Sequence, residues 1–158
     1  MSKKVKNVFI SHIHEDDEEL GDLKDLLSKR GMEVRDSSIT ADKPNRAKSD
    51  EYIKYEILGP HIEWASVLIV YISPETEDSK WVNWEIEYAR EKDKIIVGVY
   101  EQGALDCEIP EALDGHGDAL VGWNAKKIID AINGDYTQFE NPDGSPRKRR
   151  TIPRHRCE

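Results

Sequence analysis

One carboxylate in the chain stands where the surrounding pattern predicts an apolar side chain. The stretch Ser79–Ala89 is typical of an amphipathic helix, and Ser79 is a suitable N-cap because its side-chain oxygen can accept from a free backbone N–H of the first turn. When the stretch is projected at about 100° per residue, seven positions share one arc of roughly 200°. Glu85 lies near the middle of that arc. The other six positions hold Trp81, Val82, Trp84, Ile86, Tyr88 and Ala89.

Glu85 admits two interpretations. Burying a carboxylate costs free energy unless another group pairs with it, so such a position is a candidate for a functional site. The alternative is a structural glutamate, bonded to an indole N–H or to a loop amide and holding two elements together. The helix pattern alone leaves both interpretations open.

A single buried carboxylate suits one reaction in particular. Cleavage of a glycosidic bond normally needs two carboxyl groups, one to protonate the leaving group and one to stabilise or attack the sugar. In NAD the nicotinamide is already cationic and departs neutral, so no acid is needed and one carboxylate beside the ribose suffices. Trp81 and Trp84 flank Glu85 on the helix and could form part of a wall that excludes water. Core packing is the alternative for both tryptophans, and we expect it for Trp84.

The elements that must position these residues alternate along the chain. The strongest strands, Val67–Ile72 and Ile95–Val99, do not alternate between apolar and polar residues, so both faces should be covered, as in a parallel sheet. Strands are predicted at Asn7–Ser11, Met32–Asp36, Val67–Ile72, Lys94–Tyr100 and Ala119–Gly122. Besides the helix that carries Glu85, helices are predicted around Leu20–Leu27 with a stop at Gly31, over Ala47–Leu58 with a stop at Gly59-Pro60, and over Asn124–Asn133 with a stop at Gly134. The region 101–118 is predicted to be a loop.

Strands and helices in this order predict an α/β fold, a flavodoxin-like doubly wound sheet of five parallel strands. At 158 residues the chain should form a single domain. We place this domain at residues 1–135 and an irregular basic tail at 136–158.

The ligand crevice of such a fold lies outside the carboxyl ends of the strands, at the switch point between the first and third strands. In this chain those ends are Ser11-His12, Asp36-Ser37 and Ser73-Pro74. The stretch 37–47 is long for a connection, which is typical of functional or mobile loops. For Ser11 and Ser73 a loop-capping hydroxyl is the alternative to a role in the site.

Composition and charge exclude several classes of function. Residues 146–158 carry six basic residues and one acidic residue, a net charge of +5, which leaves −14 on the rest of the chain. The chain outside residues 146–158 is acidic, so it lacks the basic surface that nucleic-acid binding requires. The two cysteines, Cys107 and Cys157, have no metal spacing, and His12 and His14 are too close together in an extended loop for an ordinary metal pair, so we expect no metal.

The chain shows no signal peptide and no apolar run near the ~18 residues that span a membrane, so a soluble cytoplasmic protein is expected. Phosphate-binding glycine loops of the P-loop and GxGxxG types are absent from the sequence. A response regulator would end the third strand in an aspartate, whereas this strand is followed by Ser73.

Two segments of the chain resemble the TIR domain family. Val8-Phe9-Ile10-Ser11 with Asp16 is similar to the first-strand motif of that family, and Ser79–Glu85 is similar to its S-x-W-x-x-x-E segment. The resemblance covers roughly residues 5–135 and is greatest to the TIR-like proteins of the Thoeris anti-phage system. It implies a flavodoxin-like fold, and in enzymatic members the glutamate matched by Glu85 cleaves NAD.

The resemblance further implies that NAD is a substrate rather than a cofactor, that the product is a cyclic or otherwise modified ADP-ribose signal, and that a separate effector protein binds this signal. We expect Glu85 to be catalytic. The expected substrate-binding residues are Ser11, His12, Asp36, Ser37, Ile39, Ser73 and Trp81. The alternatives are a TIR scaffold that acts by self-association and recruitment without turnover, and a flavin-binding domain on the same fold.

Overall fold

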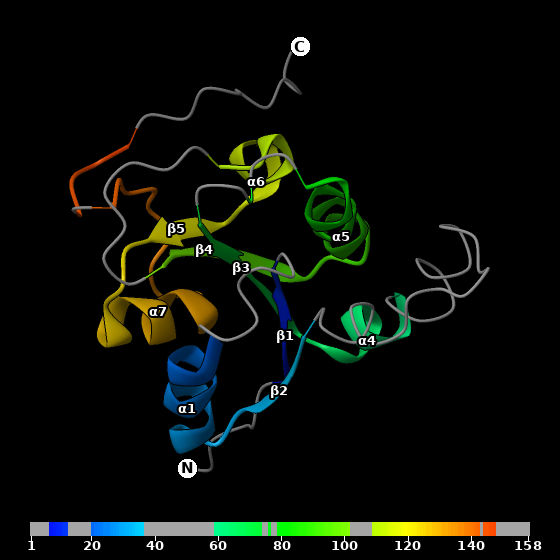
Figure 1. Ribbon diagram of the computed structural model, residues 1–158, viewed down its shortest axis with the longest axis horizontal. Helices are drawn as coiled ribbons and strands as arrows, with labels where there is room; N and C mark the ends of the chain where they lie inside the picture. The colour runs from blue at the N-terminus through cyan, green and yellow to red at the C-terminus, as the bar shows by residue number, and fades with distance from the viewer. Residues whose placement is uncertain are drawn as a thin grey trace.

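The structure is a computed structural model that describes residues 7–12, 20–36, 59–73, 76, 79–101, 109–142 and 144–147, with the side chain of Asp36 excepted. Strands and helices alternate along these residues (Figure 1). The strands are β1 (Asn7–Ser11), β2 (Glu33–Asp36), β3 (Val67–Ile72), β4 (Ile95–Tyr100) and β5 (Ala119–Val121). The helices are α1 (Gly21–Lys29), α4 (Gly59–Trp64), α5 (Lys80–Glu91), α6 (Glu111–His116) and α7 (Ala125–Ile132).

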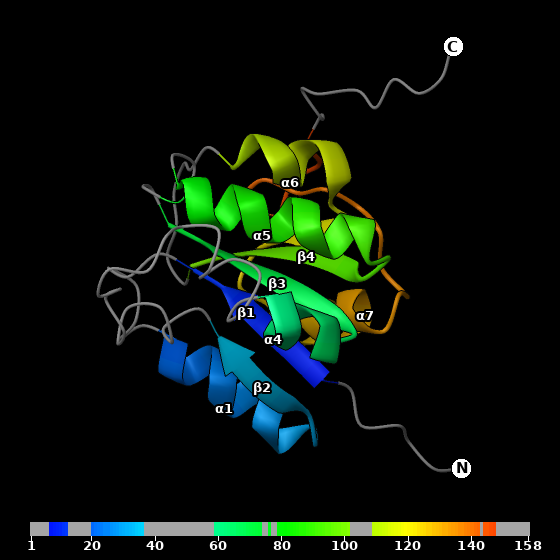
Figure 2. The ribbon, with the colours of Figure 1, turned by 90° about the vertical axis from the view of Figure 1, so that its right-hand side faces the viewer.

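The five strands form one parallel sheet in the order β2-β1-β3-β4-β5. Two apolar clusters cover its faces. Helices α4, α5 and α6 pack on one face, and α1 and α7 pack on the other (Figures 1 and 2). All six residues of β3 are buried, as their unalternated apolar sequence predicts. The predicted fold class, a doubly wound α/β sheet of five parallel strands, is confirmed.

Local signals account for several of the helix ends. The Ser79 side chain accepts from the backbone N–H of Val82 at 3.1 Å and caps α5, as predicted. The backbone of Gly31, just after α1, and that of Gly134, just after α7, have φ of 80° and 82°. Glycine adopts this left-handed conformation without the steric cost that a Cβ brings.

Two predictions about helices are wrong. Gly59 and Pro60 do not end a helix, because both belong to α4. The region 101–118 is not all loop, because α6 occupies Glu111–His116. Six residues are too few for a helical pattern to stand out in the sequence. The helix predicted over Ala47–Leu58 lies outside the described residues.

Asn83 lies outside the apolar stripe of α5, yet its side chain is held by two hydrogen bonds. Its Oδ1 accepts from the backbone N–H of Ala112 in the first turn of α6, at 3.0 Å. Its Nδ2 donates to the carbonyl oxygen of Ser79 at 2.9 Å. Asn83 therefore supplies an acceptor for one of the free N–H groups at the start of α6 and joins the two helices.

The chain after α7 returns to the edge of the sheet. The N–H of Leu120 donates to the carbonyl of Gln138 at 3.0 Å, and the N–H of Glu140 donates to the carbonyl of Leu120 at 2.8 Å, so this segment lies along β5. The Phe139 and Glu140 side chains are buried. The domain boundary after residue 135 stays a prediction, but residues on both sides of it contribute to the described sheet edge.

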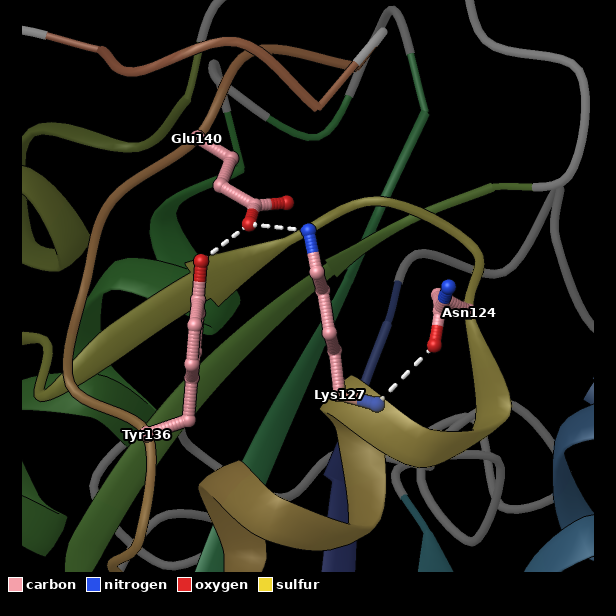
Figure 3. A network of polar contacts seen from close by, with 4 residues as sticks. All are labelled: Asn124, Lys127, Tyr136 and Glu140. Carbon is pink, nitrogen blue, oxygen red and sulfur yellow. Dashed lines mark hydrogen bonds and ion pairs between the residues drawn. The ribbon is translucent and has the colours of Figure 1, made fainter.

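A buried carboxylate holds this returning segment (Figure 3). Oε2 of Glu140 accepts from Lys127 Nζ at 2.7 Å and from the Tyr136 hydroxyl. The hydrogen bond to Glu140 raises the pKa of Lys127 and also that of Tyr136, so the ammonium and the neutral phenol are favoured at neutral pH. Asn124, the N-cap of α7, fixes the backbone that presents Lys127, since its Oδ1 accepts from the Lys127 N–H at 3.0 Å.

We expect Glu140→Gln to raise the unfolding equilibrium constant by about tenfold, because hydrogen bonds to a charged acceptor weaken when the charge is removed. Urea unfolding followed by circular dichroism measures this. The control is Asp130→Asn, which breaks the exposed pair between Lys126 and Asp130 at 2.9 Å and should change the constant by less than about threefold. Equal effects of the two variants would contradict the role given to Glu140.

Within the described ranges, no helix is both long and apolar enough to cross a membrane.

Candidate active site

Glu85 lies in the second turn of α5 and is 1% exposed. Its Oε1 accepts a hydrogen bond from the hydroxyl of Ser11, the last residue of β1. The Ser11 side chain is fully buried. The carboxylate therefore points toward the sheet rather than into solvent, and one of its partners is at the carboxyl end of the first strand.

The sheet topology explains why these two residues meet. Strand β1 pairs with β2 on one side and with β3 on the other, so the chain switches direction across the sheet at β1 and β3. Helix α5 starts beyond the carboxyl end of β3 and runs back over the sheet. Its buried stripe of Val82, Glu85, Ile86 and Ala89 faces the sheet. The Ser11–Glu85 pair thus lies near the switch point, where doubly wound folds bind ligands.

Two further predicted residues are buried at the same edge of the sheet. His12 directly follows β1 and is 4% exposed, and Ser73 directly follows β3 and is 2% exposed. Asp36 ends β2, where its backbone is paired with Ile10. The structure therefore brings the carboxyl ends of β1, β2 and β3 together, as predicted. Ser37 and Ile39 lie outside the described residues, so their assignment stays a prediction.

Thr76 is a buried polar residue that the sequence analysis did not single out. Its side chain is fully buried, and its Oγ1 accepts from the backbone N–H of Ser73 at 2.9 Å. The Ser73 and Thr76 hydroxyl oxygens are 3.2 Å apart. The available signal was a hydroxyl residue three places after Ser73, a spacing at which side chains commonly bond to a turn backbone.

The tryptophans beside Glu85 have different surroundings. Trp81 and Trp84 are both half-buried against the apolar cluster under α5. The Trp84 ring stacks on Tyr88, with 4.9 Å between ring centroids, and the Tyr88 hydroxyl donates to Glu63 of α4. Trp84 thus belongs to the packing between α5 and α4, as expected. Trp81 remains a prediction as a wall of the site.

A separate cavity of about 440 Å³ lies at the opposite edge of the sheet. Its lining includes the first residue of β4, Ile95, and Asp118, just before β5. These are the amino ends of parallel strands, so the cavity is not part of the site around Glu85. In the part of the chain that the structure describes, no group of three or more His, Cys, Asp or Glu side chains could hold a metal ion.

The five-stranded parallel sheet, with helices on both faces, is consistent with a TIR-like or flavodoxin-like α/β domain. Residues 9–106 match the family model described as Thoeris protein ThsB, TIR-like domain. The match spans more than half of the chain, which therefore belongs to the ThsB TIR-like family.

Two solved structures are similar to this chain at low sequence identity. The 2-deoxyribosyltransferase of the psychrotolerant bacterium Bacillus psychrosaccharolyticus is similar with a TM-score of 0.56 and 15% identity, over 77% of this chain and 89% of that one, which supports the fold alone. The TIR domains of the activated Roq1 resistosome, which directly recognises the pathogen effector XopQ, match with a TM-score of 0.44 and 24% identity, over 60% of this chain and 57% of that one. Among curated proteins no match is found.

Proposed function

We propose that this chain cleaves NAD between nicotinamide and ribose and makes an ADP-ribose-type signal, cyclic or otherwise modified, in anti-phage defence. One observation carries the proposal: a buried carboxylate, Glu85, is held by Ser11 at the switch point of the sheet. Membership of the Thoeris ThsB family supports the defence role. A separate effector protein that binds the signal, and self-association of TIR domains, belong to the same proposal.

The reaction needs few groups besides this carboxylate. The bond between ribose C1′ and the nicotinamide nitrogen breaks, its electron pair leaves with the nicotinamide, and the neutral base departs without a proton. Glu85 stabilises the positive charge that develops on the ribose, or attacks C1′ directly. Water then adds to C1′ and releases a proton, or a nucleophile within the same nucleotide adds and closes a ring.

Ser11 and the low-dielectric surroundings would prepare Glu85 for this task. A donated hydrogen bond fixes one carboxylate oxygen, and charge interactions are stronger where water is excluded. Because Glu85 is 1% exposed, substrate binding has to displace atoms that cover it. His12, Asp36 and Ser73 surround the same edge and would contact the nucleotide, together with Ser37, Ile39 and Trp81.

A non-catalytic TIR scaffold is the second candidate, and the same burial favours it. An enclosed carboxylate that accepts a hydrogen bond from the neighbouring strand can simply join α5 to β1. Incubating the pure protein with NAD and following nicotinamide release separates the two candidates. Release above the spontaneous rate supports the enzyme, and intact NAD across all protein concentrations supports the scaffold.

Ser11→Ala tests how the carboxylate is held. We expect nicotinamide release to fall by about tenfold to a hundredfold, because the carboxylate loses the hydrogen bond by which Ser11 orients one of its oxygens. The measurement is initial-rate kinetics on folded protein. Ser66→Ala is the control, because that serine is exposed just before β3 and should leave the rate unchanged. A Ser11→Ala rate equal to that of the unmodified chain would contradict this role.

A further inference from the structure

Thr76, which follows β3 and precedes α5 in the chain, has a fully buried side-chain hydroxyl. This oxygen accepts from the Ser73 N–H at 2.9 Å and lies 3.4 Å from the carbonyl oxygen of Tyr71, to which it donates. The Thr76 N–H in turn donates to the Ser73 carbonyl at 3.2 Å. The hydroxyl thus binds the end of β3 at two backbone positions, in a place that solvent does not reach.

The same residue is joined to the start of α5. The Thr76 carbonyl accepts from the Ser79 N–H at 3.1 Å. Ser79 caps α5 through its side chain, and its carbonyl accepts from Asn83 Nδ2 at 2.9 Å. An unbroken series of hydrogen bonds therefore runs from the end of β3 through Thr76 to the first turn of the helix that carries Glu85.

We propose that Thr76 is a positioning residue, whose hydroxyl sets the start of α5 relative to the sheet and thereby places the Glu85 carboxylate against Ser11. The kinetic part of this inference rests on the proposed NAD cleavage. Among the described residues, the hydrogen bonds of Thr76 go to the end of β3 and to the start of α5 and none goes to the Glu85 carboxylate, so its effect on that carboxylate passes through the helix.

The geometry of a helix makes this coupling strong. Glu85 follows the N-cap Ser79 by six residues, about 9 Å along a rigid helix at ~1.5 Å per residue, so a shift of the cap moves the carboxylate with it. Misplacing a reacting group by about 1 Å can cost a hundredfold in rate. Water cannot replace the lost hydrogen bonds of Thr76, since the side chain is fully buried.

The first test compares Thr76→Val, which keeps the shape and removes the hydroxyl, with Thr76→Ser, which keeps the hydroxyl. We expect Thr76→Val to lower kcat by about tenfold to a hundredfold with KM changed less than about threefold, and Thr76→Ser to restore kcat to within about threefold. Phe139→Leu is the control for a general loss of stability, because Phe139 is a buried residue that lies beside β5. At temperatures where this variant is folded, its kcat should be unchanged. If Thr76→Val does not fold, Thr76→Ala takes its place.

A second readout needs no turnover. Urea unfolding of Ser11→Ala, Thr76→Val and the double variant forms a double-mutant cycle. If the two residues are coupled, the change in the unfolding constant of the double variant should differ by about threefold or more from the product of the two single changes. Coupling for Thr76→Val, and none for Thr76→Ser, supports the positioning role. This holds even if the unmodified chain releases no nicotinamide, because that result would overturn only the proposed function. Independent effects in the cycle, or a normal kcat for Thr76→Val in an active enzyme, would overturn the inference.

Discussion

Replacing Glu85 by glutamine should lower nicotinamide release from NAD by about a thousandfold or more, because the amide is nearly the same shape but carries no negative charge to stabilise the ribose cation. Substrate binding should be changed much less, since the charge matters most in the transition state. Initial rates and NAD affinity, measured on the same preparation, give both values.

The control for Glu85→Gln is Glu87→Gln, two residues along the same helix. Glu87 is exposed, so the same chemical change there should leave the rate within about twofold. Circular dichroism and urea unfolding establish that both variants are folded. An active Glu85→Gln variant, or equal losses in the two variants, would remove the catalytic role of Glu85 and leave it a structural role.

Replacing Phe139 by alanine should lower the free energy of unfolding by about 3 kcal/mol, a typical cost of emptying the space of a buried aromatic ring. Phe139 is 7% exposed and lies opposite Leu120 of β5. Its ring also approaches Gly117, where a Cβ would lie 3.2 Å from the ring. The effect should appear as a lower urea midpoint with an unchanged slope.

The neighbouring variant Gln138→Ala distinguishes the contribution of the Phe139 ring to stability from that of the backbone of this segment. Gln138 is exposed, and its bond to Leu120 uses its carbonyl oxygen, which alanine keeps. Its unfolding free energy should change by less than about 0.5 kcal/mol. If Phe139→Ala were equally mild, the segment after α7 would contribute little to the fold, and the domain would end before it.

The sequence predicts most of this fold because its strands and helices differ in pattern. Continuous apolar runs such as Val67–Ile72 require a sheet covered on both faces. A serine and an asparagine cap the starts of α5 and α7, and a glycine follows the end of α7. These local signals agree with the parallel alternation, so the strand order follows from the topology rules for such sheets.

What the sequence does not predict depends on contacts between distant residues. Asn83 looks like a solvated residue until α6 is placed beside α5, where its oxygen meets the Ala112 N–H. Glu140 and Phe139 follow a helix stop and have no regular pattern, and they are buried only because the chain turns back along β5. No periodicity within one segment encodes such pairings.

The candidate site was predictable to a similar degree. The strand-end rule places Ser11 and Ser73 at one edge, and the helix pattern turns Glu85 toward the sheet. The hydrogen bond between Ser11 and Glu85 depends on the depth at which α5 lies over β1, which the sequence alone does not give. Thr76 was missed for the same reason, since its hydroxyl matters only in the turn that it closes.

The most direct test of the account is the product balance of NAD treated with the pure protein, with nucleotides identified by mass and by retention against standards. If Glu85 cleaves NAD, the unmodified chain should form one nicotinamide for each ADP-ribose-type nucleotide, and Glu85→Gln should form neither product above background. Recovery of all NAD intact from the unmodified chain, or the same products at the same rate from Glu85→Gln, would contradict it.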